Sequence, residues 1–97
     1  MVNIGVIGCG HWGPNHIRIF SHQLNSRVLM CADVSEERLK SVKNLYPHCE
    51  ALTDYHKILE NKDIQAVCVA SPTNTHYAIS RDALLAQKHV LCENRWP

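Results

Sequence analysis

The chain has 97 residues, of which 45% are hydrophobic, and ten Lys and Arg against nine Asp and Glu give it a formal net charge of +1. A near-neutral surface of mixed sign lacks the basic patch that binds nucleic acid or an anionic membrane, so we expect neither partner. No apolar run is longer than that of residues 66–70, which is far shorter than the roughly 18 residues of a membrane span. No signal-peptide pattern opens the sequence, and the composition predicts one globular domain.

The cysteines and histidines indicate a cytoplasmic protein without a metal site. The five cysteines are odd in number, and no two have the C-x-x-C spacing of zinc and redox sites. His11 and His16 are five residues apart and do not share a helix face. We therefore expect reduced thiols, no bound metal and a cytoplasmic location.

The first half of the chain alternates two strands with two helices. Residues 2–7 form a short apolar strand that ends at a glycine cluster, and Pro14 suits the first turn of a helix. The buried face of that helix would comprise Ile17, Phe20 and Leu24. The apolar run 27–32 predicts a strand buried on both faces, and Ser35 can cap a second helix. The buried face of this second helix would comprise Leu39, Val42 and Leu45.

The second half continues the alternation. A short strand at 50–52 precedes a small helix that Thr53 would cap. Its inward-facing residues would be Tyr55, Ile58 and Leu59. Residues 66–70 form the fourth strand, a polar loop follows at 71–74, and residues 89–92 form the fifth strand. The helix between these last two strands would bury Ile79, Ala83 and Ala86.

This alternation predicts an α/β fold. Short apolar strands separated by amphipathic helices form βαβ units and a parallel sheet. Right-handed crossovers favour a doubly wound, three-layer αβα arrangement with five strands in the order 3-2-1-4-5. Such sheets bind ligands beyond the carboxyl ends of their strands, so the residues after each strand carry the functional hypotheses.

A glycine-rich loop, Gly8-Cys9-Gly10-His11-Trp12-Gly13, follows the first strand and opens the first helix. Its G-x-G-x-x-G spacing in that context is a dinucleotide-binding fingerprint. Gly8 permits the tight turn, Gly10 lets a pyrophosphate approach the backbone, and Gly13 lets the helix pack closely on the strand. The alternative is a glycine-rich turn without a ligand.

Asp33 ends the second strand, twenty residues after Gly13. A carboxylate at this place accepts hydrogen bonds from the adenosine ribose and repels a 2′-phosphate. No Arg or Lys follows it before Arg38, so we expect NAD rather than NADP. The alternative is an aspartate that caps the next helix, although Ser35 already offers that cap.

Together these motifs resemble the N-terminal domain of the Gfo/Idh/MocA oxidoreductases, which are sugar and inositol dehydrogenases and their relatives. The resemblance spans residues 2 to 93 and rests on segments 8–16, 32–33, 71–76 and 89–93. The stretch Trp12-Gly13-Pro14-Asn15 is most similar to members that act on nucleotide-sugars, such as the UDP-N-acetylglucosamine(-uronate) 3-dehydrogenases. The resemblance implies a Rossmann-like domain that binds NAD.

The resemblance also implies roles for single residues. The glycines of the loop would bind the pyrophosphate, and His11 and Trp12 would lie over the cofactor. Cys9, in the same loop, would belong to the cofactor-binding site as well. Asp33 would hold the adenosine ribose. The nicotinamide side would be lined by Ser71, Pro72, Thr73, Asn74, His76 and Glu93. No catalytic residue is expected within this chain.

The end of the chain departs from the family, which continues with Glu-Lys-Pro. Here the sequence reads Glu93-Asn94-Arg95-Trp96-Pro97, and Asn94 has no titratable amine to replace the lysine. Loss of one base from a suitable lysine codon would yield Glu-Asn-Arg-Trp-Pro-stop. We therefore expect a domain truncated after the fifth strand, which lacks the substrate domain and binds the cofactor without catalysis.

Truncation would leave a sheet edge unprotected, which would permit self-association. The alternative is a stand-alone dinucleotide-binding module that regulates or binds another protein.

Overall fold

The computed structural model describes residues 2–8, 26–70 and 73–92, so the predicted helix with Ile17, Phe20 and Leu24 lies outside the described residues. The strands are β1 (Val2–Ile7), β2 (Ser26–Ala32), β3 (Glu50–Leu52), β4 (Ala66–Val69) and β5 (His89–Cys92). The helices are α2 (Glu36–Leu45), α3 (His56–Glu60) and α4 (Thr73–Leu85). No helix in these segments is long and apolar enough to cross a membrane.

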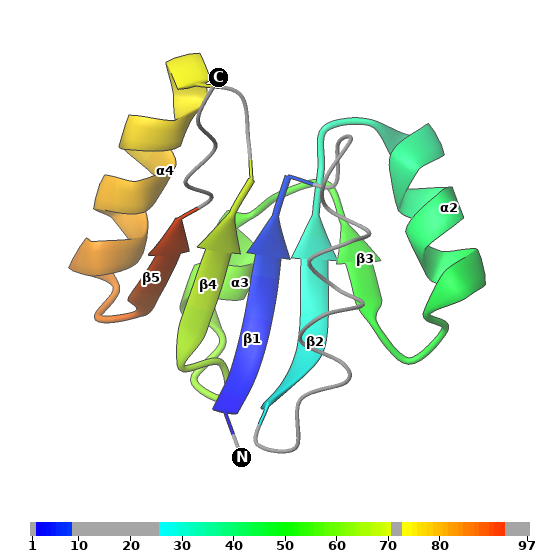
Figure 1. Ribbon diagram of the computed structural model, residues 1–97, viewed down its shortest axis with the longest axis horizontal. Helices are drawn as coiled ribbons and strands as arrows, with labels where there is room; N and C mark the ends of the chain where they lie inside the picture. The colour runs from blue at the N-terminus through cyan, green and yellow to red at the C-terminus, as the bar shows by residue number, and fades with distance from the viewer. Residues whose placement is uncertain (1, 9–25, 71–72, 93–97) are drawn as a thin grey trace.

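The five strands form one parallel sheet in the order β3-β2-β1-β4-β5 (Figure 1). This is the predicted doubly wound order, and every predicted strand is confirmed to within one residue at its ends. The chain proceeds from β1 outward to β3, then crosses to β4 on the other side of β1. The order therefore reverses between β1 and β4, which is where such sheets open a crevice for ligands.

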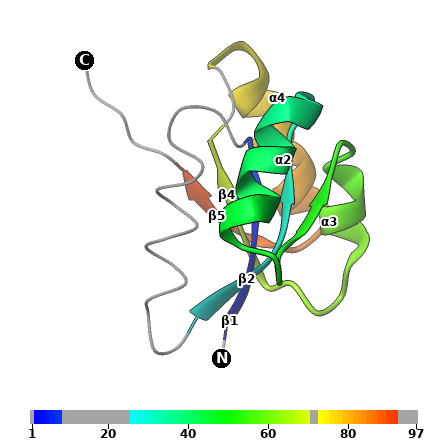
Figure 2. The ribbon, with the colours of Figure 1, turned by 90° about the vertical axis from the view of Figure 1, so that its right-hand side faces the viewer.

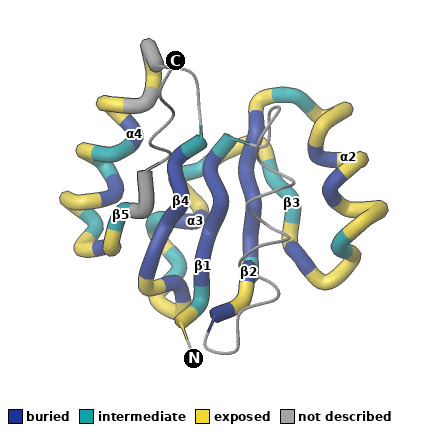
Figure 3. Tube along the Cα trace, in the orientation of Figure 1, coloured by how far each residue is buried: buried dark blue, intermediate teal, exposed yellow. Residues whose placement is uncertain are grey.

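Each face of the sheet has its own core, because successive side chains of a strand point to opposite faces. The core on the α2 side consists of Ile4, Val6, Val28, Cys31, Leu39, Val42, Cys49, Ala66 and Cys68. The core on the side of α3 and α4 consists of Ile7, Met30, Ala32, Ile58, Ile64, Val67, Val69, Ile79 and Ala83. Figure 2 shows α3 beside the strands in the turned view, and Figure 3 shows the buried residues concentrated along β1, β2 and β4.

A bulge in β2 lets its apolar run serve both cores. Ile4 pairs with Val28 but Gly5 pairs with Met30, so Leu29 is an extra residue in the β2 strand. Val28 and Cys31 consequently share the α2 face although they are three residues apart. Burial on both faces, predicted from the continuous apolar run, is confirmed.

Two local expectations about the helices are wrong. Leu39 and Val42 of α2 are buried, but Leu45 is 64% exposed. Six residues turn a helix by about 600°, which places Leu45 roughly 120° from Leu39 and outside the buried stripe. Thr53 does not cap α3, whose N-cap is Tyr55 without a side-chain cap. The turn is instead held by Asp54, whose Oδ1 accepts from the backbone N–H of His56 at 3.0 Å.

Candidate cofactor site

The carboxyl ends of three strands meet at one edge of the sheet. The backbone N–H of Gly8, just beyond β1, donates to the carbonyl of Ala32 at the end of β2 at 2.7 Å. On the other side of β1, the N–H of Ala70 donates to the carbonyl of Ile7 at 2.8 Å. The segments that follow β1, β2 and β4 therefore start from neighbouring points, at the place where the strand order reverses.

Gly8 begins the turn that the fingerprint requires. Its φ of 93° lies in the left-handed region, which glycine adopts without a steric penalty. The chain thus leaves β1 sharply at the first glycine of the motif, as predicted. The remaining loop residues, Cys9, Gly10, His11, Trp12 and Gly13, lie outside the described residues.

Asp33 carries a buried carboxylate and follows Ala32, whose carbonyl receives the Gly8 N–H. Its backbone N–H donates to the carbonyl of Leu52 at 3.1 Å, which ties the end of β2 to β3. Its side chain is 5% exposed, and its Oδ1 accepts the backbone N–H of Ser35 at 2.8 Å. A buried carboxylate that accepts hydrogen bonds suits the role of an acceptor for ribose hydroxyls.

The alternative role for Asp33, that of a helix cap, belongs to Ser35. The Ser35 side chain accepts the backbone N–H of Arg38 at 3.3 Å and forms the N-cap of α2. Glu36 and Glu37 add negative charge to the first turn, where the helix dipole favours it. Asp33 therefore holds the turn between β2 and α2 without being the cap itself.

Arg38 lies nearer to Asp33 than the sequence suggested. Its Nη1 lies 3.9 Å from Asp33 Oδ2, and its side chain is 59% exposed. In the sequence it stands five residues from Asp33, which suggested that no cation adjoins the acid. Because Ser35 starts the helix two residues after Asp33, the first turn of α2 brings Arg38 back toward the carboxylate.

The other predicted residues follow strands that end at the same edge. Thr73 and Asn74 open α4 shortly after β4, and His76 belongs to the same helix. Cys92, the last residue of β5, pairs with Val69, the last residue of β4. The side chains of Thr73, Asn74 and His76 lie outside the described part of the chain, as do Ser71, Pro72 and Glu93.

A separate polar cluster joins α3 to α4. The Tyr55 hydroxyl donates to Asp82 Oδ2 at 2.7 Å, and this bond raises the pKa of Tyr55. His56 Nδ1 lies 2.8 Å from Asp54 Oδ1, and hydrogen bonds from His56 lower the pKa of Asp54. The cluster links two helices on one face of the sheet.

The described thiols are structural. Cys31, Cys49 and Cys68 are buried, and none of them forms a disulfide. The hydrogen bond that the Cys49 thiol donates to Cys31 and burial both raise the pKa of Cys49, which keeps this thiol protonated and unreactive. Within residues 2–8, 26–70 and 73–92, no three His, Cys, Asp or Glu side chains are grouped to hold a metal ion.

Comparison with known proteins agrees with this geometry. Residues 2–94 match the description "Oxidoreductase family, NAD-binding Rossmann fold". The chain is 35% identical over 92 residues to a myo-inositol 2-dehydrogenase from Thermotoga maritima, covering 95% of this chain and 28% of that protein. It is 30% identical to the uncharacterized oxidoreductase YrbE from Bacillus subtilis, covering 92% of this chain and 26% of YrbE.

Solved structures show the same fold with a cofactor bound. KijD10, a 3-ketoreductase from Actinomadura kijaniata in complex with TDP-benzene and NADP, is 29% identical with a TM-score of 0.86, over 96% of this chain and 29% of that one. A scyllo-inositol dehydrogenase from Lactobacillus casei with NAD(H) and scyllo-inositol is 26% identical with a TM-score of 0.84, over 97% and 28%. The chain thus spans a little over a quarter of the length of the relatives that it matches.

Proposed function

The chain belongs to the Gfo/Idh/MocA oxidoreductase family with an NAD-binding Rossmann fold, and from this membership we propose that it binds NAD at the carboxyl edge of its sheet. The adenosine ribose would lie on Asp33 and the pyrophosphate on the turn that starts at Gly8. One observation carries the proposal: a carboxylate with 5% exposure follows the Ala32 carbonyl that receives the Gly8 N–H. The two anchors of the fingerprint are therefore adjacent in space.

We further assign the rest of the edge to the cofactor. The loop residues Cys9, Gly10, His11, Trp12 and Gly13 would complete the pyrophosphate side. The nicotinamide side would comprise Ser71, Pro72, Thr73, Asn74, His76 and Glu93. The strand order supports this division, because these segments follow β4 and β5 on the far side of β1 from Asp33.

We propose that this domain contributes to an oxidoreductase that oxidises a sugar or nucleotide-sugar hydroxyl. When bound, NAD supplies the hydride acceptor for that chemistry. Support comes from relatives described as an inositol dehydrogenase and a 3-ketoreductase. Since the chain spans 28% of the inositol dehydrogenase, the proposal gives these 97 residues the cofactor-binding step, and we expect no turnover by them alone.

The second candidate is a cytoplasmic binding module that associates through the sheet edge with a second copy of itself. In the described part of the chain, β5 pairs with β4 alone, which leaves one side of β5 for another strand. The neighbouring helix α4 presents Tyr77, Leu84 and Leu85, which are 77%, 63% and 76% exposed. Sedimentation of the wild type and of Leu84→Glu tests this: a dimer that Leu84→Glu dissociates supports it, and a monomeric wild type excludes it.

Calorimetric titration of NAD and NADP into the purified chain tests the cofactor assignment. We expect NAD to bind more tightly than NADP, and Asp33→Ala to weaken NAD binding by about tenfold or more, since hydrogen bonds to charged groups contribute about 1.5–3 kcal/mol. Asp63→Ala, which removes an exposed carboxylate before β4 at the opposite edge, is the matched control and should leave the affinity unchanged. Folded protein that binds neither cofactor, or binds equally well without Asp33, would refute the proposal.

A further inference from the structure

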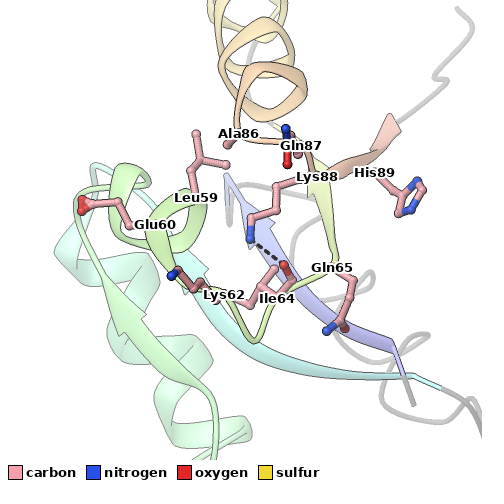
Figure 4. Close-up of a pocket in the computed structure, with 9 residues that line it drawn as sticks. All are labelled: Leu59, Glu60, Lys62, Ile64, Gln65, Ala86, Gln87, Lys88 and His89. Atoms are coloured by element: carbon pink, nitrogen blue, oxygen red, sulfur yellow. Dashed lines mark hydrogen bonds between the residues drawn. The ribbon is translucent and has the colours of Figure 1, made fainter.

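A surface depression of about 570 Å³ lies at the amino edge of the sheet, opposite the cofactor edge (Figure 4). It is bounded by the segments that lead into β4 and β5. Leu59, Ile64 and Ala86 give it apolar surface, and Lys62, Gln65 and Lys88 give it polar groups. The proposed binding of NAD at the carboxyl edge involves none of these residues.

The end of α4 directs Lys88 into this depression. The backbone N–H of Lys88 donates to the carbonyl of Ala83 at 3.0 Å, and that of Gln87 donates to Leu84 at 3.0 Å. Gln87 has a φ of 64°, so the helix ends in a Schellman motif with a left-handed residue. The chain therefore turns sharply, and the Lys88 side chain crosses to the segment before β4 (Figure 4).

The Lys88 ammonium group is buried beside two backbone carbonyls. Its Nζ donates to the carbonyl oxygen of Asn61 at 2.7 Å and to that of Ile64 at 2.6 Å. The residue is 9% exposed, and burial lowers the pKa of its amine. An ammonium group has three N–H donors, so these bonds use two of them.

No carboxylate neutralises this group among the residues that the structure describes. Glu60 is the one acidic residue of the lining, and it forms no ion pair with Lys88. Lys62 adds a second positive charge at the same depression. A buried cation without a counter-charge is costly, and an anion that enters the depression would remove that cost.

We propose that this depression binds a small oxyanion, a phosphate or carboxylate group, which accepts the third N–H of Lys88. Lysine is a compact point charge that binds such groups without a fixed fork geometry. Lys62 contributes attraction from the rim. The Gln65 Oε1 is occupied by the backbone N–H of Asn3 at 2.7 Å, which leaves the Gln65 amide N–H₂ as a further donor. The apolar surface of Leu59, Ile64 and Ala86 accommodates the carbon part of an organic anion.

The test is a titration of the ¹⁵N-labelled chain with inorganic phosphate and, separately, with acetate, at constant ionic strength set by chloride. We expect saturable shifts of the Ile64, Lys88 and His89 amide signals, and the ion that binds more tightly distinguishes a phosphate from a carboxylate ligand. The signals of Gly8 and Asp33 report separately on any anion in the cofactor site. Shifts that do not saturate, or that occur only around Gly8, would overturn the proposal whether or not NAD binds.

Two lysine variants locate the effect. Lys62→Gln should raise the dissociation constant about threefold, because a rim charge contributes modestly. Lys57→Gln removes an exposed charge from α3 that does not line the depression, and it should leave the constant unchanged. If both variants weaken anion binding equally, the anion responds to the overall positive charge of the surface and not to a defined site.

Lys88→Met removes the central donor and should abolish saturation. Because it also leaves two carbonyls without their donor, circular dichroism must first show that the variant is folded. If it is not folded, the pair of variants at Lys62 and Lys57 decides the question. A folded Lys88→Met chain that still shows saturable shifts would overturn the proposal.

Discussion

The two edges of the sheet use polar side chains in opposite ways. At the carboxyl edge, backbone hydrogen bonds to Ala32 and Leu52 hold Gly8 and Asp33, and the Asp33 side chain adds a local contact with the backbone N–H of Ser35. At the amino edge, side chains themselves connect the segments. Asn3 is the centre of these connections, since its backbone N–H donates to Gln65 Oε1 at 2.7 Å and its Nδ2 donates to the Asp63 carbonyl at 2.8 Å.

This difference shows how one sheet separates long-range structural connections from the proposed cofactor site. Side chains at the amino edge satisfy backbone groups across long sequence separations, such as Asn3 to Asp63 and Lys88 to Ile64. The Asp33 carboxylate meets Ser35 and Arg38, which are close to it in sequence. We therefore expect substitutions at the amino edge to change the free energy of unfolding, and substitutions at Asp33 to change cofactor affinity.

Gly5→Ala should have the largest effect, because it disturbs the sheet that both edges share. A Cβ at Gly5 would clash with Cγ2 of Ile58 on α3, and α3 would have to move away from the sheet. We expect a loss of about 2–3 kcal/mol in urea unfolding, as for other overpacked cores, with NAD affinity weakened as well. In an Ile58→Ala background, which removes the clashing carbon, the same substitution should cost far less. An equal cost in both backgrounds would contradict this account.

Asp33→Ser should change the choice of cofactor. It removes the charge that repels a 2′-phosphate and leaves Arg38, now 3.9 Å from the carboxylate, to attract one. The ratio of NADP to NAD affinity, measured by calorimetry, should rise about tenfold, which corresponds to about 1.4 kcal/mol. The double variant Asp33→Ser/Arg38→Gln should lose most of that rise. If it retains the rise, Arg38 does not face the 2′-position.

Tyr55→Phe should lower stability by about 1 kcal/mol, because it removes one hydrogen bond between α3 and α4. The bond to Asp82 raises the pKa of Tyr55, so its contribution is complete below the unfolded tyrosine pKa of about 10 and is lost as the pH rises through the higher folded value. Unfolding of wild type and variant should therefore differ at pH 7 and converge in strong alkali. NAD affinity should not change, and a clear loss of affinity would connect this cluster to the cofactor edge.

Gln87→Gly should have the smallest effect and the opposite sign. Gln87 occupies the left-handed region at a φ of 64°, where a side chain is strained and glycine is not. We expect urea unfolding to show a gain of about 0.5 kcal/mol, reduced from the full strain by the greater freedom of glycine in the unfolded chain. Gln87→Ala is the control and should give no gain. Destabilisation by glycine would mean that the Gln87 side chain makes a compensating contact.

Local signals were sufficient for most of the fold. The glycine cluster after β1, the cap at Ser35 and the apolar runs are each readable within a few residues, and their order leaves few topologies. The errors, Leu45 and Thr53, lie at helix ends, where one residue of drift changes a side chain's surroundings. The predicted residues of the loop after Gly8, and of the segments beyond β4 and β5, remain predictions.

The sequence by itself determined the strand order, the turn at Gly8 and the acid at the end of β2. Hydrophobic periodicity, and the residues that begin or end helices and strands, are patterns of residues close together in the chain. Only the tertiary structure decided the bulge at Leu29, the Tyr55–Asp82 bond and the reach of Lys88 to Ile64. These features depend on strand register and on how helices rotate against the sheet. Packing between segments some two dozen residues apart sets both, and no local pattern in the chain records it.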